Sequence, residues 1–246
     1  MHRDTYLEQL ARDGGRMAEL ANGDLTAKVP TCPDWTLRDL LLHTGQVHRW
    51  QAEAGRTDAG TFPDMSSAKQ PPADDAAFAD WFQRGVDAAV TTLSTVDPDA
   101  PRWTWAKPSG GDTAQWYFRR IAQETLVHRI DAELAAGVER NVVDPPFAVD
   151  GIEEMFDMFI PASPPEPSIG GRGETLHLHA TDVEGEWLVT ILADHVTIDR
   201  GHAKGDAAVR GKAIDLLLFV WGRDLGGIER FGDEAVIDRL YAGFKL

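Results

Sequence analysis

The chain has 246 residues and a formal net charge of −16, from 24 basic and 40 acidic side chains. This length accommodates one large domain or two small ones, and the apolar content is enough for a sizeable core. The acidity argues against nucleic acid or an anionic membrane as a partner, because phosphate groups are bound by clustered Lys and Arg. No apolar run approaches the length of a membrane-spanning helix.

The single cysteine, Cys32, excludes an intramolecular disulfide and fits a reducing compartment. The first residues are mixed and polar, unlike a signal peptide, so we expect a cytoplasmic protein. Cys32 itself has two interpretations. It is either a nucleophile or extra ligand beside the following helix, or a small, partly buried residue without a chemical role.

The first 160 residues are expected to be helical. Apolar residues at helical spacing predict a helix over 4–22. Thr36, with Asp39 three residues on, is suited to cap a second helix that runs through His43 to about residue 54. Further helices are predicted from Asp74 or Asp75 to about 93, over 113–136 with Gly137 as the stop, and over 147–160.

The pattern changes after the segment 161–173, which is rich in Pro and Gly and is typical of a linker. Alternating apolar residues then predict short strands joined by tight turns, followed by two helices: strands at 176–180, 187–192 and 195–198, helices at 212–221 and 233–241. We therefore predict an α+β chain with a helix bundle over 1–160 and a small α+β domain over 174–246.

Three residues have the chemistry and spacing of a metal site. Glu124 and His128 lie four positions apart, so in a helix they share one face. His43 on a facing helix would complete a His2Glu set, which fills three tetrahedral positions of a zinc-like ion and leaves one open, as catalytic sites do. Asp131 extends the same helical stripe, and apolar neighbours indicate that the stripe points at least partly inward.

The same residues also have a purely structural interpretation. Glu124 can pair with Arg120 or His128 within one helical turn, and His43 at the end of an apolar run can be a hydrogen-bonded core residue. His48 lies five positions from His43, roughly 140° around the helix, so it is not expected to be a co-ligand. Spacing alone leaves these interpretations open.

Two motifs resemble a known family. The stretch 33–43 (PDWTLRDLLLH) resembles the second-helix motif of the DinB-like four-helix bundles, and 124–131 (ETLVHRID) resembles the second motif of the branch that includes the mycothiol-dependent maleylpyruvate isomerases. In that branch a small α+β domain follows the bundle, and 216–223 (LLLFVWGR) resembles its apolar helix. The resemblance implies a DinB-like fold and covers nearly the whole chain.

Matched residue by residue, the resemblance implies that His43, Glu124 and His128 are metal ligands. It also implies that an arginine of the C-terminal domain handles the substrate; Arg223 is the nearest match, with Arg210 in reserve. The structural alternative for Arg223 is a surface ion pair with Asp224 or Asp233. By geometry, Asp131 is expected to orient His128 or an incoming group.

The function that follows is metal activation of a small thiol such as mycothiol, for cis–trans isomerisation of an unsaturated diacid or for S-transfer. Zinc is the expected metal, with nickel or iron as alternatives. The partners would be a small-molecule thiol and a small-molecule substrate. Two alternatives stay open: a non-catalytic metal-binding or regulatory module on the same fold, and a metal-dependent hydrolase.

Overall fold

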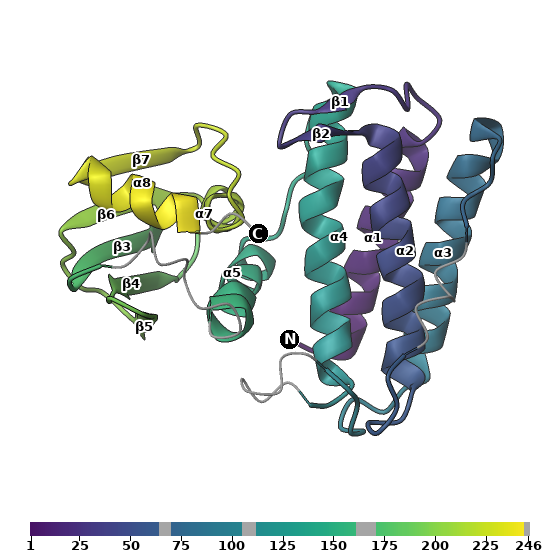
Figure 1. Ribbon diagram of the computed structural model, residues 1–246, viewed down its shortest axis with the longest axis horizontal. Coiled ribbons are helices and arrows are strands. Elements are labelled where there is room, and N and C mark those ends of the chain that lie inside the picture. The colour runs from purple at the N-terminus through teal and green to yellow at the C-terminus, as the bar shows by residue number, and fades with distance from the viewer. Residues whose placement is uncertain (64–69, 105–111, 161–170, 244–246) are drawn as a thin grey trace. The chain divides into compact units, whose positions relative to one another are not determined.

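The structure is a computed structural model that describes residues 1–63, 70–104, 112–160 and 171–243 (Figure 1). The chain divides into two compact units, Met1–Asn141 and Val142–Leu246. The first unit is built from helices and the second from a sheet with helices. None of the helices in the described part of the chain combines the length and the apolar character that crossing a membrane requires.

The first unit is a four-helix bundle in which α1 and α2 each pack against both α3 and α4. A short hairpin joins α1 to α2, and a 3-10 turn precedes α3. The bounds are α1 (Arg3–Leu20), β1 (Lys28–Val29), β2 (Cys32–Thr36), α2 (Leu37–Arg56), η2 (Asp75–Ala77), α3 (Phe78–Ser94) and α4 (Gln115–Ala136). The predicted bundle is thus present.

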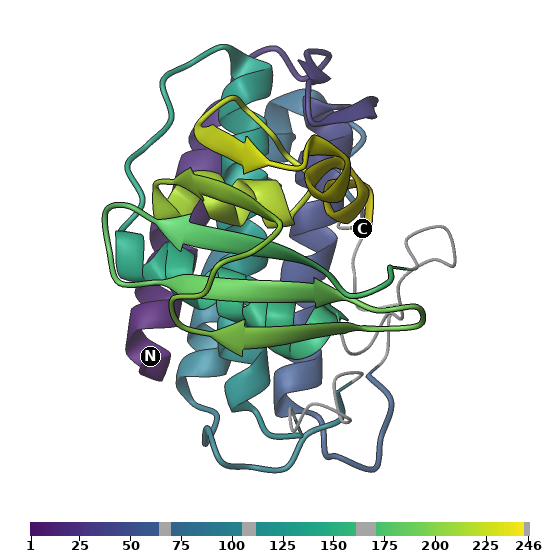
Figure 2. The same ribbon diagram turned by 90° about the vertical axis from the view of Figure 1, so that its left-hand side faces the viewer.

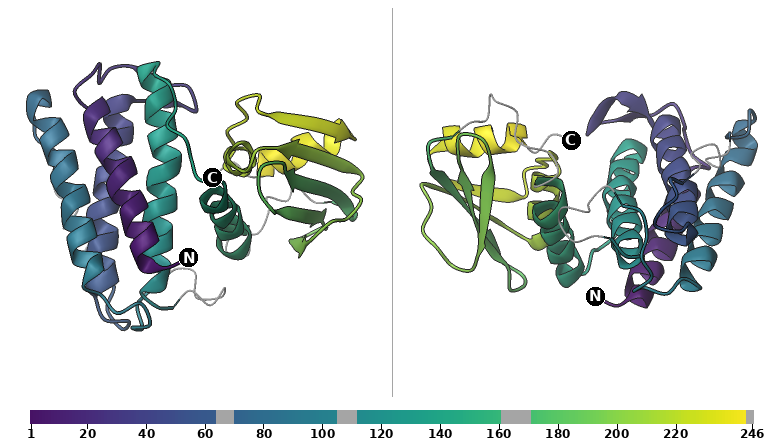
Figure 3. Two further views of the ribbon diagram at one scale, coloured as in Figure 1. Left: turned by 180° about the vertical axis from the view of Figure 1, so that it is seen from behind. Right: turned by 60° about the horizontal axis from the view of Figure 1, so that its bottom comes forward.

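Helices α2 and α3 run parallel, as the contacts of two glycines on α2 show. Gly45 faces Trp81 near the start of α3, and Gly55 faces Leu93 near its end. The connection between the two helices must therefore return along the length of the bundle. Helices α2 and α4 run antiparallel, and Figure 3 shows the four helices from two further directions. This topology places the middle of α2 against the middle of α4.

The helix ends follow the expected chemistry. Thr36 and Asp39 form a reciprocal capping box at the start of α2: each side chain accepts a hydrogen bond from the backbone N–H of the other residue. Gly137 ends α4 with φ 65°, a left-handed conformation that glycine adopts without steric cost. Both predicted ends of these helices are confirmed.

A buried ion network lies between α1 and α4. The guanidinium of Arg129, which is fully buried, lies 3.4 Å from Asp13 and 2.6 Å from Glu133. Glu133 also accepts hydrogen bonds from Arg16 and from the backbone N–H of Asn141. Buried charges are tolerated only when they are paired, so this network fixes the position of α1 on α4.

The second unit contains a five-stranded sheet in the order β5-β4-β3-β6-β7, in which only the β3–β6 pair is parallel. In the sequence, helix α5 precedes the strands, α7 lies between β6 and β7, and α8 follows β7. The bounds are α5 (Pro145–Glu154), a π-helical turn η4 (Met155–Phe159), β3 (Glu174–Ala180), β4 (Glu186–Ile191), β5 (Val196–Arg200), β6 (Ala207–Gly211), α7 (Ala213–Val220), β7 (Ile228–Gly232) and α8 (Glu234–Gly243).

One face of this sheet is apolar and covered. Leu176 and Leu178 of β3 are fully buried, and Val189 and Trp187 pair with them across β4. Arg200 reaches Glu153 of α5 from the same face, which locates α5 there. The opposite face carries the alternate residues of each strand. Figure 2 looks onto the strands of this second face.

The two units divide at Asn141, whereas the sequence suggested a boundary at residue 160. The segment 145–160, expected as part of the bundle, packs through α5 against α7 of the second unit. Its buried apolar face therefore belongs to the core of that unit. Most of the expected linker, residues 161–170 of 161–173, lies outside the described residues. The hairpin β1–β2 and the strands β6 and β7 were not expected.

Candidate metal centre

The structure brings His43 of α2 together with Glu124 and His128 of α4. One potential ligand atom from each lies within 4.8 Å of the others. Glu124 Oε1 is 3.3 Å from His43 Nε2 and 3.2 Å from His128 Nε2. A single carboxylate oxygen therefore faces both imidazole rings. One ring lies on its own helix, α4, and the other lies across the antiparallel contact on α2.

The three side chains differ in their access to water. The side chain of His128 is 10% exposed and that of His43 is 39% exposed. The cluster is thus anchored inside the bundle on the α4 side and reachable from solvent on the α2 side. An exogenous molecule can approach the cluster past His43.

Neighbouring side chains hold the cluster in place. Asp131 Oδ2 lies 2.9 Å from His128 Nδ1, so Nε2 of the same ring is directed toward Glu124. Thr31 Oγ1 donates a hydrogen bond of 2.6 Å to the other oxygen of Asp131. Arg120 donates to Glu124 Oε2 at 2.8 Å, which leaves Oε1 for the histidines. Both pairings of Glu124 in the structural interpretation are therefore present together with the cluster.

Sequence reasoning missed two residues that reach this cluster from the hairpin β1–β2. Thr31 hydrogen-bonds to Asp131 across 100 positions of sequence. The ring of Trp35 lies 5.0 Å from that of His43 and 6.3 Å from that of His128, centroid to centroid. Trp35 lies inside the 33–43 motif, so the motif could have identified it as a site residue. The position of Thr31 depends on how the hairpin folds, and no local sequence pattern indicated it.

The electrostatics of the cluster favour ionised side chains. Burial by itself raises the pKa of Glu124, but hydrogen bonds and charge from His128, with His43 and Arg120, outweigh it and hold this pKa well below its usual value. Burial likewise opposes the charged form of His128, yet Asp131 and Glu124 raise the pKa of His128 to about 9. The cluster is therefore built to hold positive charge beside two carboxylates.

The donor set fits a divalent cation of the zinc type. Two imidazole nitrogens and one carboxylate oxygen are ligands that zinc takes, and three protein ligands leave a position for a further group. Asp131 on the second nitrogen of His128 is the kind of partner that orients a metal-ligating histidine. The residues present thus match the chemistry of a catalytic metal site.

His48 lies outside the cluster. It is fully buried, and its Nε2 is 2.8 Å from the hydroxyl oxygen of Thr125. That hydroxyl donates to the carbonyl of Ile121, so the imidazole N–H donates to the hydroxyl. Burial, with the nearby charge of Arg49, lowers the pKa of His48 to about 3. His48 is therefore a neutral core histidine.

The other predicted residues are elsewhere in the chain. Arg223 follows α7 in the second unit, where it donates a hydrogen bond to the carbonyl of Trp221. Asp224, one candidate partner for it, pairs with Arg230 at 2.6 Å. Arg210 stands on β6 and lies 4.0 Å from Glu229. Cys32 stands on β2 and is half-buried.

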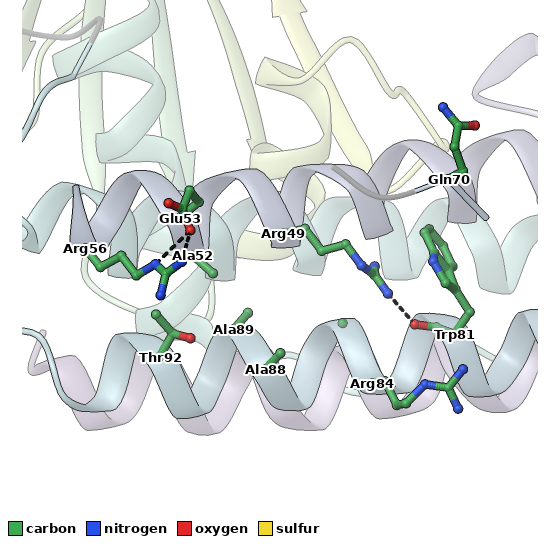
Figure 4. A pocket seen from close by; sticks show the side chains of 11 residues that line it. Arg49, Ala52, Glu53, Arg56, Gln70, Trp81, Arg84, Ala88, Ala89 and Thr92 are labelled. Carbon is green, nitrogen blue, oxygen red and sulfur yellow. Dashed lines mark hydrogen bonds and ion pairs between the residues drawn. The ribbon is translucent and has the colours of Figure 1, made fainter. Parts of the chain in front are cut away.

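A separate cavity of about 480 Å³ lies between α2 and α3. Figure 4 shows its lining, in which Arg49 reaches across to the carbonyl of Trp81 while Arg56 pairs with Glu53. The guanidinium of Arg49 also lies 4.0 Å above the ring of Trp81. None of the three candidate ligands lines this cavity. The cluster of His43, Glu124 and His128 is therefore separate from this cavity.

Comparison with solved structures shows what fold this is. The crystal structure of the mycothiol-dependent maleylpyruvate isomerase superposes with a TM-score of 0.63 at 11% sequence identity, covering 94% of this chain and 93% of that one. A histidine-to-alanine mutant of that isomerase gives the same TM-score and coverage at 10% identity. No curated protein matches the sequence.

Two family models match the sequence itself. The model described as the mycothiol maleylpyruvate isomerase N-terminal domain matches residues 7–133, and the model of the C-terminal domain of the same family matches residues 146–239. The gap between the two matches contains the division between the compact units at Asn141. The chain therefore belongs to the mycothiol maleylpyruvate isomerase family and carries both of its domains.

Proposed function

We propose that this chain is a metal-dependent isomerase that uses mycothiol to convert maleylpyruvate, or a similar unsaturated diacid, from the cis to the trans form. Family membership supports the thiol and the reaction class. The observation that carries the metal dependence is the convergence of His43, Glu124 and His128, with His43 half exposed.

His43, Glu124 and His128 would hold the cation in this proposal. When bound, it would supply a Lewis-acid position at which a thiol loses its proton more easily. Arg120 fixes the Glu124 carboxylate through Oε2, and Asp131 fixes the ring of His128 through Nδ1. These two contacts would restrain Glu124 and His128 in orientations in which their donor atoms lie close to that of His43.

The reaction requires no oxidant or reductant. A thiolate adds to the conjugated double bond, the former double bond rotates as a single bond, and loss of the same thiolate restores it in the trans form. A cationic side chain that pairs with the substrate carboxylates would stabilise the enolate-like intermediate. Arg223 is the residue that we propose for this role.

The test uses the purified full-length chain loaded with zinc. Maleylpyruvate loss is followed with and without mycothiol, in the wild type and in His43→Ala and Glu124→Gln variants. We expect turnover only with the thiol, and a loss of at least about 100-fold in both variants, because each removes a ligand. His2→Ala, which removes an exposed histidine of the same unit, should retain full activity.

Two results would overturn the proposal: no turnover by the zinc-loaded wild type with mycothiol present, or full activity in His43→Ala. A stable thioether product in place of the isomerised diacid would instead assign S-transfer to an electrophile. Mass spectrometry of the reaction products separates these outcomes.

The role of Arg223 has its own test. Arg223→Met should lower kcat/KM while bound metal stays unchanged, because this residue is not among the three ligands. Arg210→Met is the matched control in the same unit, and it should behave as the wild type. Equal losses in the two variants, or no loss in Arg223→Met, would remove Arg223 from the mechanism.

A further inference from the structure

A second group of side chains of the types that bind metals lies in the second unit. It is distant in sequence from His43, Glu124 and His128, which are called the bundle cluster below. His177 and His179 stand on β3, Glu186 begins β4, and His202 follows the end of β5. One potential ligand atom from each of these four residues lies within 4.8 Å of the others. The family motifs identified in the sequence include none of the four.

The sheet itself brings the first three residues together. His179 pairs directly with Glu186 in the antiparallel register of β3 and β4, so both side chains point to the same face. His177, two residues earlier on β3, also points to this face. It is the face opposite the buried Leu176 and Leu178, and therefore not the one that packs into the core of the unit.

The fourth residue arrives from the chain after β5. Gly201 has φ 115°, a backbone conformation that side-chain-bearing residues rarely adopt. The chain reverses there, and His202 Nδ1 comes to 2.7 Å from Glu186 Oε2. The turn therefore adds a histidine to a face on which the strands already provide two.

The four side chains converge on one carboxylate. Glu186 Oε2 lies 3.0 Å from His177 Nε2, and Oε1 lies 3.2 Å from His179 Nδ1. The rings of His177 and His202 meet edge to face at 5.4 Å between centroids. Three imidazoles around one carboxylate give four donors at separations from which small side-chain rotations would centre them on one ion.

The side chains of the group differ in their exposure to solvent, as in a site that takes up its ion from solution. The side chain of His177 is 9% exposed, whereas that of His202 is 81% exposed. His179, Glu186 and His202 also line an open cavity of about 530 Å³. An ion can therefore reach the inner donors from this cavity, and His202 can close over it.

We propose that His177, His179, Glu186 and His202 form a second divalent-cation site, of the zinc type. Three imidazoles and one carboxylate complete a tetrahedral zinc shell, so all four positions of this site are taken by protein, whereas the bundle cluster has three donors among the residues that the structure describes. A bound ion would tie β3, β4 and the turn after β5 together, which is the role of a structural metal.

The test measures metal stoichiometry in the full-length protein, purified without a histidine tag. The chain is stripped with a chelator, loaded with Zn²⁺, dialysed and analysed for metal, and binding is titrated calorimetrically. We expect two zinc ions per wild-type chain, and one fewer when His179→Ala and His202→Ala are combined, because two donors remain. His195→Ala is the matched control, because His195 is an exposed histidine of the same unit that pairs with Asp194 instead.

His43→Ala separates this site from the bundle cluster. If the second site exists, His43→Ala still binds the zinc ion that His179→Ala/His202→Ala lacks, whether or not the protein is an isomerase. Co²⁺ in the His43→Ala background should give the intense visible absorption of a tetrahedral site, and the further changes His179→Ala and His202→Ala should abolish it. Circular dichroism verifies that each variant is folded.

The proposal is overturned if the wild type and the double variant His179→Ala/His202→Ala bind the same number of zinc ions. It is equally overturned if the dissociation constant for zinc in His43→Ala lies in the millimolar range, because such weak binding would mean that the four side chains form a hydrogen-bonded surface cluster and not a metal site. A thermal midpoint that rises with zinc in His43→Ala, but not in His43→Ala combined with Glu186→Gln, would support a structural role.

Discussion

His128 Nδ1 lies 2.9 Å from Asp131 Oδ2, one turn along the same helix, and Asp131 is fully buried. The contact decides which nitrogen of His128 carries a proton, because the N–H must face the carboxylate. When His128 gives up its second proton, as a metal-ligating imidazole must, the other nitrogen presents its lone pair toward Glu124. A residue outside the ligand set thus prepares the ring to bind a cation.

Asp131→Asn should weaken metal binding at the bundle cluster by about 10- to 100-fold, because the neutral amide supports the ring less strongly. Competition with a chelator measures this, in the His179→Ala/His202→Ala background so that only the bundle cluster is filled. Asp34→Asn, at an exposed position of the hairpin, is the control and should leave affinity unchanged. Equal affinity in the two variants would show that Asp131 has only a packing role.

Arg129→Met should destabilise the bundle by about 3–5 kcal/mol, because Asp13 and Glu133 would remain buried without their cation. Urea unfolding followed by circular dichroism gives the free energy. Arg16→Met removes a cation that is partly exposed and also contacts Glu133, so its cost should be about 1 kcal/mol or less. A loss below about 1 kcal/mol in Arg129→Met would mean that water reaches the network.

His48 should make the protein sensitive to acid. Its pKa falls from 6.5 to about 3 on folding, chiefly through burial, so below pH 6.5 the unfolded chain binds a proton that the folded chain excludes. The stability that this group contributes is complete above pH 6.5 and is lost as the pH falls toward 3. The slope is at most about 1.4 kcal/mol per pH unit.

His48→Gln keeps a donor for Thr125 and removes this titration. The difference in unfolding free energy between the wild type and His48→Gln should therefore change between pH 6.5 and 4 and stay constant above. If the unfolding free energies of the wild type and His48→Gln change in parallel with pH, the imidazole of His48 is not neutral and buried in the folded protein.

Gly45→Ala tests the close approach of α2 and α3. A Cβ at Gly45 would lie 2.7 Å from the ring of Trp81, which is itself covered by Arg49. Overpacking should cost about 1–3 kcal/mol, which exceeds the gain of up to about 1 kcal/mol in helix propensity. At Gly15 the nearest atom is 3.9 Å away, so Gly15→Ala should be neutral or stabilising by thermal unfolding.

Much of this structure follows from local patterns. The capping box at Thr36, the stop at Gly137 and the i, i+4 pair Glu124 and His128 are set by residues close in sequence. The convergence of His43 on that pair depends on two helices packing, which spacing could suggest but not decide. The resemblance to the family motifs supplied that step.

The features that the sequence did not predict depend on contacts between residues that are far apart in the chain. Strand β6 is short and mixed, and it pairs with β3 in parallel only because the intervening strands and turns return the chain to that edge. The pairing of Arg129 with Asp13 joins positions on different helices. His202 lies after the end of β5, and the turn at Gly201 brings it to Glu186. Such relationships have no local signature.

The antiparallel contact between α2 and α4 has a consequence for how the protein is made. His43 and Glu124 are 81 positions apart, so a growing chain has neither Glu124 nor His128 when α2 is complete. The bundle cluster cannot capture an ion until α4 has docked, late in the assembly of the unit. An ion in that cluster therefore selects for finished bundles, since by mass action it stabilises only the state that contains all three donors.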